Sequence, residues 1–176
     1  MLINNNKLKD SKIINLNKIE DKRGFFSRLY CNKILKNKLG GFKVLQINNS
    51  LSKYKATLRG MHFQKGKYAE AKIVRCINGS IQDVIIDLRK NSPTYKNTFS
   101  MVLNNKNRTM LYVPRGFAHG FLTLEKNTEV MYLVDNYYNP KFESGLKYND
   151  PSFNIKWKLK VKHISKKDND WKDYIK

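Results

Sequence analysis

The middle of the chain is a succession of short apolar segments, rich in β-branched and aromatic side chains, that short polar turns separate. Such side chains are enriched in strands. Several short strands at regular spacing are typical of a β-sandwich or barrel. The sequence therefore predicts an all-β fold. The expected strands are residues 72–77, 80–88, 98–103, 109–113, 119–124 and 129–134.

The dipeptide Asn78-Gly79 lies between the first two of these segments. A type I′ turn needs positive φ at both central residues, which Asn and Gly tolerate well. An Asn-Gly pair between two apolar runs is the strongest short-range signal for a hairpin. We therefore expect residues 72–77 and 80–88 to pair with each other.

The flanking segments predict little further regular structure. Residues 33–39 are expected to form a short helix, because Gly40-Gly41 follows them and glycine commonly ends helices. The basic tail from Lys158 onward contains Trp171 and Tyr174, whose rings would dock it on the sheets. We see no internal repeat, linker or second domain, so residues 1–176 are expected to form one domain.

The chain has a formal net charge of +21, from 35 Lys and Arg against 14 Asp and Glu. Such a charge is typical of proteins that bind nucleic acid or anionic membranes. The lysines are spread along the sequence and form no block, which favours a solvated basic surface instead. Part of the charge would also suit an anionic small molecule such as a nucleotide diphosphate. We expect neither nucleic acid nor membrane as a partner.

Two cysteines, Cys31 and Cys76, are isolated and lack the spacing of metal ligands. A reducing compartment is their simplest setting. Residues 1–12 contain no apolar run long enough for a signal peptide. No stretch approaches the roughly 20 apolar residues of a membrane span. These features predict a cytoplasmic protein.

Two of the three histidines lie in dense apolar segments that also contain glycine. His62 is in LRGMHFQ, His119 is in PRGFAHGF, and His163 is in the lysine-rich tail, where we assign it no role. Histidine exchanges protons near neutral pH. A metal site would need three or four His, Cys or carboxylate ligands, and His62 with Glu70 is a thin set. We therefore expect proton-transfer chemistry with no metal and no cofactor.

Proton transfer at carbon needs partners for the base. The base is usually oriented by a carboxylate, which the residues around His62 do not identify. A developing enolate needs a cation or donor, for which Lys72 and His119 are candidates. Inversion needs a second proton carrier, and Tyr132 is a phenol in an apolar strand. From the residues alone, core packing for Tyr132 and His119 and a solvated position for Lys72 remain open.

Several motifs occur in an order that resembles a known family. They are residues 21–26 (DKRGFF), 58–64 (LRGMHFQ), 71–75 (AKIVR), 87–94 (DLRKNSPT) and 113–121 (VPRGFAHGF), followed by 136–138, 149–151 and 155–157. The chain closely resembles the dTDP-4-dehydrorhamnose 3,5-epimerases of the rhamnose pathway. The resemblance covers about residues 17–168.

The resemblance implies a cupin-type jelly roll and a metal-independent epimerase of a nucleotide-linked 4-keto-6-deoxy sugar. It implies that His62 is the base, that Asp168 pairs with it, and that Tyr132 donates the proton. Lys72 and His119 would stand near the reacting sugar. Because the C4 keto group acidifies C3 and C5, His62 would leave an enolate that these donors stabilise.

The resemblance also implies the residues that bind the substrate and the oligomeric state. A homodimer that exchanges strands is typical of the family. The expected contacts to substrate or nucleotide are Arg23, Gln46, Asn48, Arg59, His119, Tyr138, Glu143 and Lys167. The basic members Arg23, Arg59 and Lys167 would suit a diphosphate.

Three positions depart from the family pattern. Arg28 replaces a glutamate, Ile47 replaces an aspartate between Gln46 and Asn48, and Ala71 replaces a frequent glycine. We keep Arg28 among the binding candidates, because a change from acid to base there would alter which base or sugar is accepted. Two alternatives therefore stay open. One is a C3-only or C5-only epimerase of another nucleotide deoxysugar. The other is a non-catalytic basic jelly roll that binds nucleic acid, in which His62, Tyr132 and Asp168 would have no reason to occur together.

Overall fold

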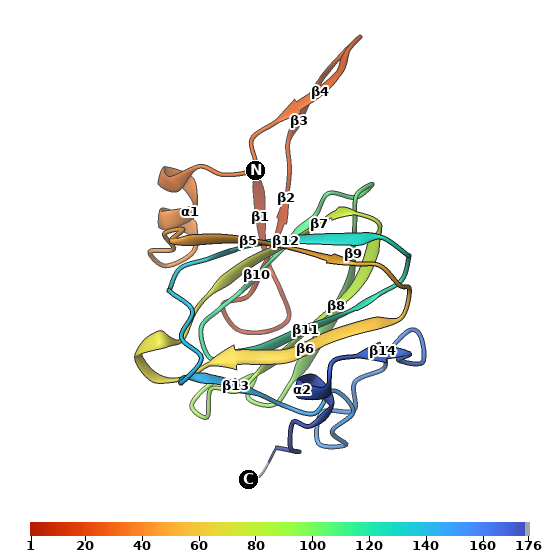
Figure 1. Cartoon of the computed structure of the whole chain (residues 1–176). Helices are drawn as coiled ribbons and strands as arrows, with labels where there is room; N and C mark the ends of the chain where they lie inside the picture. Colours follow the sequence, from red (N-terminus) through yellow and green to blue (C-terminus); the bar gives the residue numbers. More distant parts are fainter. Residues whose placement is uncertain (175–176) are drawn as a thin grey trace.

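Two antiparallel sheets face each other in the computed structural model, which describes residues 1–174 (Figure 1). The first sheet has the order β1 (Leu2–Asn5), β2 (Lys12–Asn15), β10 (Met110–Val113), β7 (Lys72–Asn78), β12 (Thr128–Val134) and β5 (Gln46–Ser52). The second has the order β13 (Glu143–Gly145), β6 (Thr57–Gln64), β11 (Phe117–Thr123), β8 (Ser80–Asp87) and β9 (Thr98–Asn104). The short strand β14 (His163–Ile164) runs parallel beside β6.

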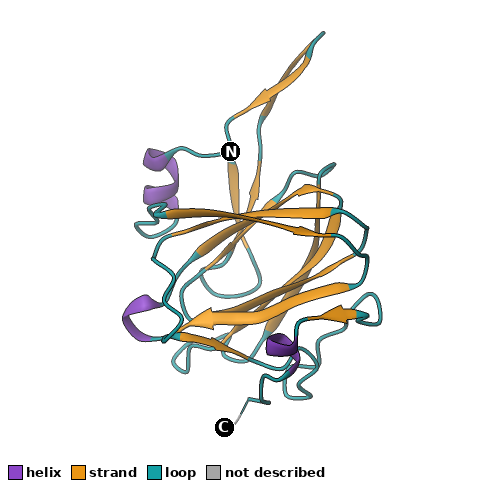
Figure 2. Ribbon diagram, viewed as in Figure 1, coloured by secondary structure: helices purple, strands orange, loops and turns teal. Residues whose placement is uncertain are grey.

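Helices are few, as the colours of Figure 2 show. They are α1 (Asn32–Lys38), a one-turn 3₁₀ helix (Gly66–Tyr68) and α2 (Lys166–Asn169). The all-β prediction is confirmed. The structure also confirms strands over the six predicted segments and the short helix predicted over residues 33–39, which spans Asn32–Lys38. Gly40, at φ +61°, and Gly41, at φ +91°, follow its end.

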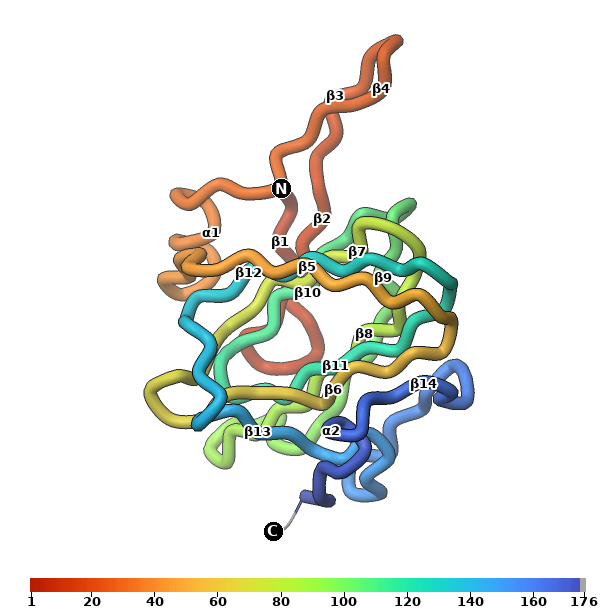
Figure 3. The backbone as a smooth tube through the Cα atoms, viewed as in Figure 1, coloured from red at the N-terminus to blue at the C-terminus, as the bar shows by residue number. Residues whose placement is uncertain are grey.

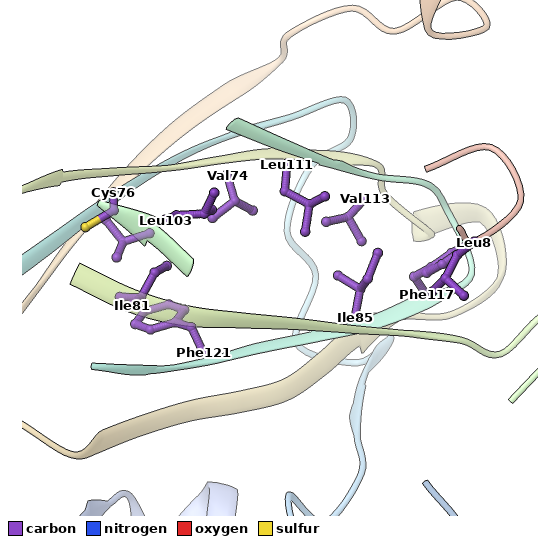
Figure 4. Packing of buried hydrophobic residues seen from close by; sticks show 11 residues of the cluster. Leu8, Val74, Cys76, Ile81, Ile85, Leu103, Leu111, Val113, Phe117 and Phe121 are labelled. Atoms are coloured by element: carbon purple, nitrogen blue, oxygen red, sulfur yellow. The ribbon is translucent and has the colours of Figure 1, made fainter. Parts of the chain in front are cut away.

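The main core fills the space between the two sheets. Val74 and Leu111 from the first sheet meet Ile81, Ile85 and Phe121 from the second (Figure 4). A further cluster covers the outer face of the first sheet, where Leu35 of α1 packs with Ile14, Ile73 and Leu133. Strand side chains alternate between faces, so both faces of the central strands are covered.

The C-terminal tail covers the outer face of the second sheet, as its rings predicted. Tyr174 packs against Phe153 with ring centroids 5.6 Å apart, and its hydroxyl lies 2.8 Å from that of Tyr95. Val84 and Ile86 of β8 pack on this face with Leu146 and Phe153, and Tyr174 packs against the same cluster. As a result β8 is buried at every position on both faces. Figure 3 shows the tail returning beneath β6.

The predicted hairpin at Asn78-Gly79 is wrong. β7 belongs to the first sheet and β8 to the second, so the chain turns a corner between sheets. Gly79 has φ +75°, but Asn78 is not among the residues with positive φ, as a type I′ turn would require. Its side-chain amide instead donates to the carbonyl of Asn127, at 2.8 Å. The polar groups of this corner are satisfied by neighbouring loops rather than by a paired strand.

A two-stranded hairpin, β3 (Lys18–Asp21) and β4 (Gly24–Ser27), extends away from both sheets (Figures 1 and 3). We call residues 18–28 the arm. Its apolar side chains are exposed, at 69 % for Ile19 and 61 % for Phe26. Within residues 1–174, no helix is long and apolar enough to cross a membrane.

Candidate active site

A cleft opens between the two sheets near the β6 and β12 strands. It has one lobe of about 520 Å³ and a smaller one of about 400 Å³. Three side chains line both lobes and so mark the place where the lobes meet: His62, Lys72 and Tyr132. The sequence had singled out all three.

His62 and His119 are direct neighbours across two antiparallel strands. Residue 62 of β6 pairs with residue 119 of β11 in the sheet register. Directly opposed residues of such a pair point to the same face. Both rings therefore face the cleft and line its larger lobe. The two histidines that the sequence placed 57 positions apart form one group.

Asp168 completes an oriented pair with His62. One carboxylate oxygen lies 2.7 Å from Nε2 of His62, and the other accepts the backbone N–H of Gly60 at 3.2 Å. Ser165 caps α2 by accepting the N–H of Asp168. Burial alone would raise the pKa of Asp168, but the bonds from His62 and Gly60 outweigh it and hold this pKa below 3.8. The carboxylate therefore stays ionised beside the imidazole.

His119 has a carboxylate partner of its own, which the sequence analysis missed. Nε2 of His119 lies 2.9 Å from Asp83 on β8, and the Asp83 side chain is fully buried. A buried carboxylate is stable only when it is paired or hydrogen-bonded. Asp83 lies amid isoleucine and valine in a central strand. A charge at such a position is the signal that could have found it.

The opposite wall of the cleft belongs to the first sheet. Tyr132 is on β12 and Lys72 begins β7. The pKa of Tyr132 is raised, first by burial and then by the negative charge of Glu70, while Arg59 lowers it. The ammonium of Lys72 lies 2.8 Å from Glu70. A protonated phenol and a held cation thus face the histidines.

Most of the predicted binding residues line the two lobes. Gln46, Asn48, Tyr138 and Glu143 line the smaller lobe, and Arg59 lines the larger. Three of these residues, Gln46, Tyr138 and Glu143, are joined by hydrogen bonds. The hydroxyl of Tyr138 donates to Glu143 at 2.6 Å, and Gln46 accepts the backbone N–H of Tyr138 at 2.9 Å.

Lys167 joins this set through Glu143. Its ammonium pairs with the Glu143 carboxylate. Burial would raise the pKa of Glu143, but Lys167 and the Tyr138 hydroxyl together lower it. A protein cation, a phenol and a carboxylate therefore meet at the rim of the smaller lobe. Such a rim suits polar groups of a ligand.

Three residues are not where the sequence led us to expect. Arg23 and Arg28 lie on the arm, away from both lobes of the same chain, and Arg23 pairs with Asp21 at 2.6 Å. Ile47 is 62 % exposed and alternates with the cleft-facing Gln46 and Asn48, so its side chain points away from the cleft. The departure at Ile47 therefore lies outside the cleft.

His163 lines the larger lobe, although we assigned it no role. Its ring stacks on Tyr54 with centroids 4.8 Å apart. The short strand β14 carries it there by pairing with β6. Within residues 1–174, no group of three or more His, Cys, Asp or Glu side chains is arranged to hold a metal ion.

Comparison with known proteins identifies the family. The model of the dTDP-4-dehydrorhamnose 3,5-epimerase family matches residues 5–175. The chain belongs to this family. It is accordingly an isomerase, and its two sheets are those of a cupin jelly roll.

Individual members of the epimerase family are similar to this chain over most of their length. The dTDP-4-dehydrorhamnose 3,5-epimerase of Sinorhizobium fredii is 40 % identical over 158 residues, which are 89 % of this chain and 81 % of that protein. The crystal structure of the Elizabethkingia anophelis enzyme superposes with a TM-score of 0.95 at 40 % identity, covering 99 % of this chain and 96 % of that one. A Legionella pneumophila epimerase in complex with dTDP-4-keto-L-rhamnose gives 0.91 at 33 % identity, covering 98 % and 92 %.

Proposed function

We propose that the chain inverts C3 and C5 of dTDP-4-dehydro-6-deoxyglucose to give dTDP-4-dehydrorhamnose. The observation that carries this proposal is the arrangement of the proton carriers. His62 belongs to one sheet and Tyr132 to the other, and both line the junction of the two lobes. A sugar ring between them meets a base on one face and an acid on the other, as inversion at carbon requires.

His62 is the proposed base. The C4 ketone acidifies the hydrogens on C3 and C5, and the imidazole removes one of them as a proton. Asp168 orients the ring and supports the imidazolium, because its carboxylate is ionised and lies 2.7 Å from Nε2. Tyr132 then delivers a proton to the opposite face of the carbon. Its raised pKa keeps the phenol protonated until that step.

The enolate is stabilised by charge near its oxygen. Lys72 lines both lobes, and His119 lines the larger one with Asp83 behind it. A cation and an oriented donor in a largely buried site act strongly on a developing oxyanion. This chemistry proceeds with side chains alone. The ligand of the Legionella relative, dTDP-4-keto-L-rhamnose, supports the choice of a nucleotide-linked keto sugar.

We also propose that the active form is a homodimer in which the arm of one chain reaches the cleft of the other. The exposed apolar residues Ile19, Phe25 and Phe26 on the arm support this proposal, because they would gain burial against a partner. Arg23 and Arg28 would then contact the bound nucleotide sugar. The two free thiols, Cys31 and Cys76, suit the reducing cytoplasm that we propose as the location.

An exchange assay in deuterated water tests the function. With dTDP-4-dehydro-6-deoxyglucose, we expect deuterium at both C3 and C5 by NMR, and its loss in His62→Ala. Deuterium at one carbon only would instead select a single-site epimerase, and exchange only with another nucleotide sugar would agree with the change from acid to base at Arg28. No exchange with any dTDP-, CDP- or GDP-linked 4-keto sugar would reject the epimerase function.

A further inference from the structure

Glu70 is a titratable group in the cleft that the mechanism above does not use. It lies at the end of the loop between β6 and β7, and its side chain is only 10 % exposed. It lines the smaller lobe together with His62, Lys72 and Tyr132. A carboxylate so far removed from water needs strong partners.

Those partners are Lys72 and Gln64, and Gln64 connects Glu70 to the backbone of neighbouring segments. Oε1 of Glu70 lies 2.8 Å from Nζ of Lys72, and Oε2 accepts the side-chain N–H of Gln64 at 2.8 Å. Gln64 is buried, donates to the carbonyl of Tyr137, and accepts the backbone N–H of Asn139 at 2.7 Å. The ammonium of Lys72 is thereby tied to β6 and to the segment that carries Tyr138.

We propose that Glu70 is a positioning residue for the epimerisation, which fixes the ammonium of Lys72 and sets a negative charge near Tyr132. The proposal rests on the proposed function, in which Lys72 stabilises the enolate and Tyr132 donates a proton. A lysine side chain has four rotatable bonds, so its ammonium can occupy many positions. It stabilises a charge at one position in the cleft only if a partner holds it there. A nearby carboxylate also opposes early loss of the phenolic proton.

The charges around Tyr132 support the second role. Burial and Glu70 raise the pKa of Tyr132, and Arg59 lowers it. The other titratable groups that share its lobes are His62 on β6, Lys72 on β7, His119 on β11, His163 and Asp168 in the tail, and Tyr54, Tyr138 and Glu143. Glu70 is the carboxylate whose charge acts most on the phenol.

The test is the pH dependence of epimerisation in Glu70→Gln and Glu70→Asp. The amide removes the charge but keeps an acceptor for Lys72. We expect the alkaline limb of kcat to move to lower pH by roughly half a unit or more, because the phenolate forms more readily. The aspartate keeps the charge but is one methylene shorter. For it we expect an unmoved alkaline limb and a kcat lowered roughly tenfold, with KM nearly unchanged.

Glu125→Gln is the matched control, because Glu125 is exposed on the turn between β11 and β12. It should behave as the wild type. Suppose that the wild type incorporates deuterium. The proposal is then overturned if both Glu70 variants have the kcat and the alkaline limb of the wild type. Failure of the wild type to exchange would reject the proposed function itself. If Glu70→Gln does not unfold cooperatively on heating, Glu70→Asp decides, and a wild-type kcat there overturns the positioning role.

Discussion

Asp168 is buried but keeps its negative charge, because it forms hydrogen bonds with the imidazole of His62 and the backbone N–H of Gly60. His119 has the same kind of partner in Asp83. The family resemblance assigned His62, His119 and Asp168 to the site from the sequence, but not Asp83. Asp83 was missed because nothing near it in the sequence marks it as a partner of His119, and the pairing of β8 with β11 brings the two together.

The His62–Asp168 pair gives a prediction at this scale. Asp168→Asn keeps the size of the side chain but removes the charge that supports the imidazolium. We expect kcat for exchange to fall by roughly 10²- to 10⁴-fold. Asp170→Asn is the control, because Asp170 is exposed and pairs only with Lys166 among the ion pairs of residues 1–174. A kcat within twofold of the wild type in Asp168→Asn would remove Asp168 from the mechanism.

Elements were predictable where their apolar pattern was strong. The buried central strands follow β-branched runs, whereas β3 (KIED) and β5 (QINNSLS) are polar and were not predicted. The Asn78-Gly79 corner shows the limit of turn signals. The dipeptide marks a change of direction, but contacts from distant loops decide whether the flanking strands pair.

The tail is the element that presents Asp168 to the cleft. A Cβ added at Gly145 would lie 2.3 Å from the ring of Trp171, three residues after Asp168. Gly145 in turn pairs with His62 in the sheet register. The indole therefore packs where β13, the strand beside His62, meets the tail that carries Asp168.

Gly145→Ala should displace Trp171 and loosen α2. We expect a severalfold lower kcat and faster backbone hydrogen exchange in residues 163–174. The free energy of unfolding should fall by about 1–3 kcal/mol. The matched comparison is the double variant with Trp171→Ala. Because that change removes the ring, adding Gly145→Ala to it should cost little further. Equal costs in both backgrounds would show that Trp171 and Gly145 are not coupled.

At the scale of the whole molecule, the arm is the segment whose expected role depends on a second chain. Its arginines were expected at the substrate, yet within one chain they stand away from both lobes. Sequence motifs can assign such residues to a site, but they do not say which copy of the chain supplies them.

Mixing two inactive variants tests the exchange of arms. His62→Ala lacks the proposed base, and Arg23→Ala lacks an arginine of the arm. A mixed dimer has one cleft in which both residues are intact. After unfolding and refolding together in equal amounts, activity should recover to about a quarter of the wild type, because half of the dimers are mixed and each has one good site. Recovery no greater than the sum of the two separate variants would contradict the exchange.

The corner at Gly79 has a consequence for how this enzyme can change. It sends β7 into the sheet that contains Tyr132, the proposed acid, and β8 into the sheet that contains His62, the proposed base. Val74 and Ile85 belong to the core between these sheets. In the strand register, Val74 lies beside Tyr132 and Ile85 beside His119. We expect a larger or smaller residue at either position to change the distance between the two walls of the cleft. A change in the volume of this core is therefore expected to affect turnover as well as stability.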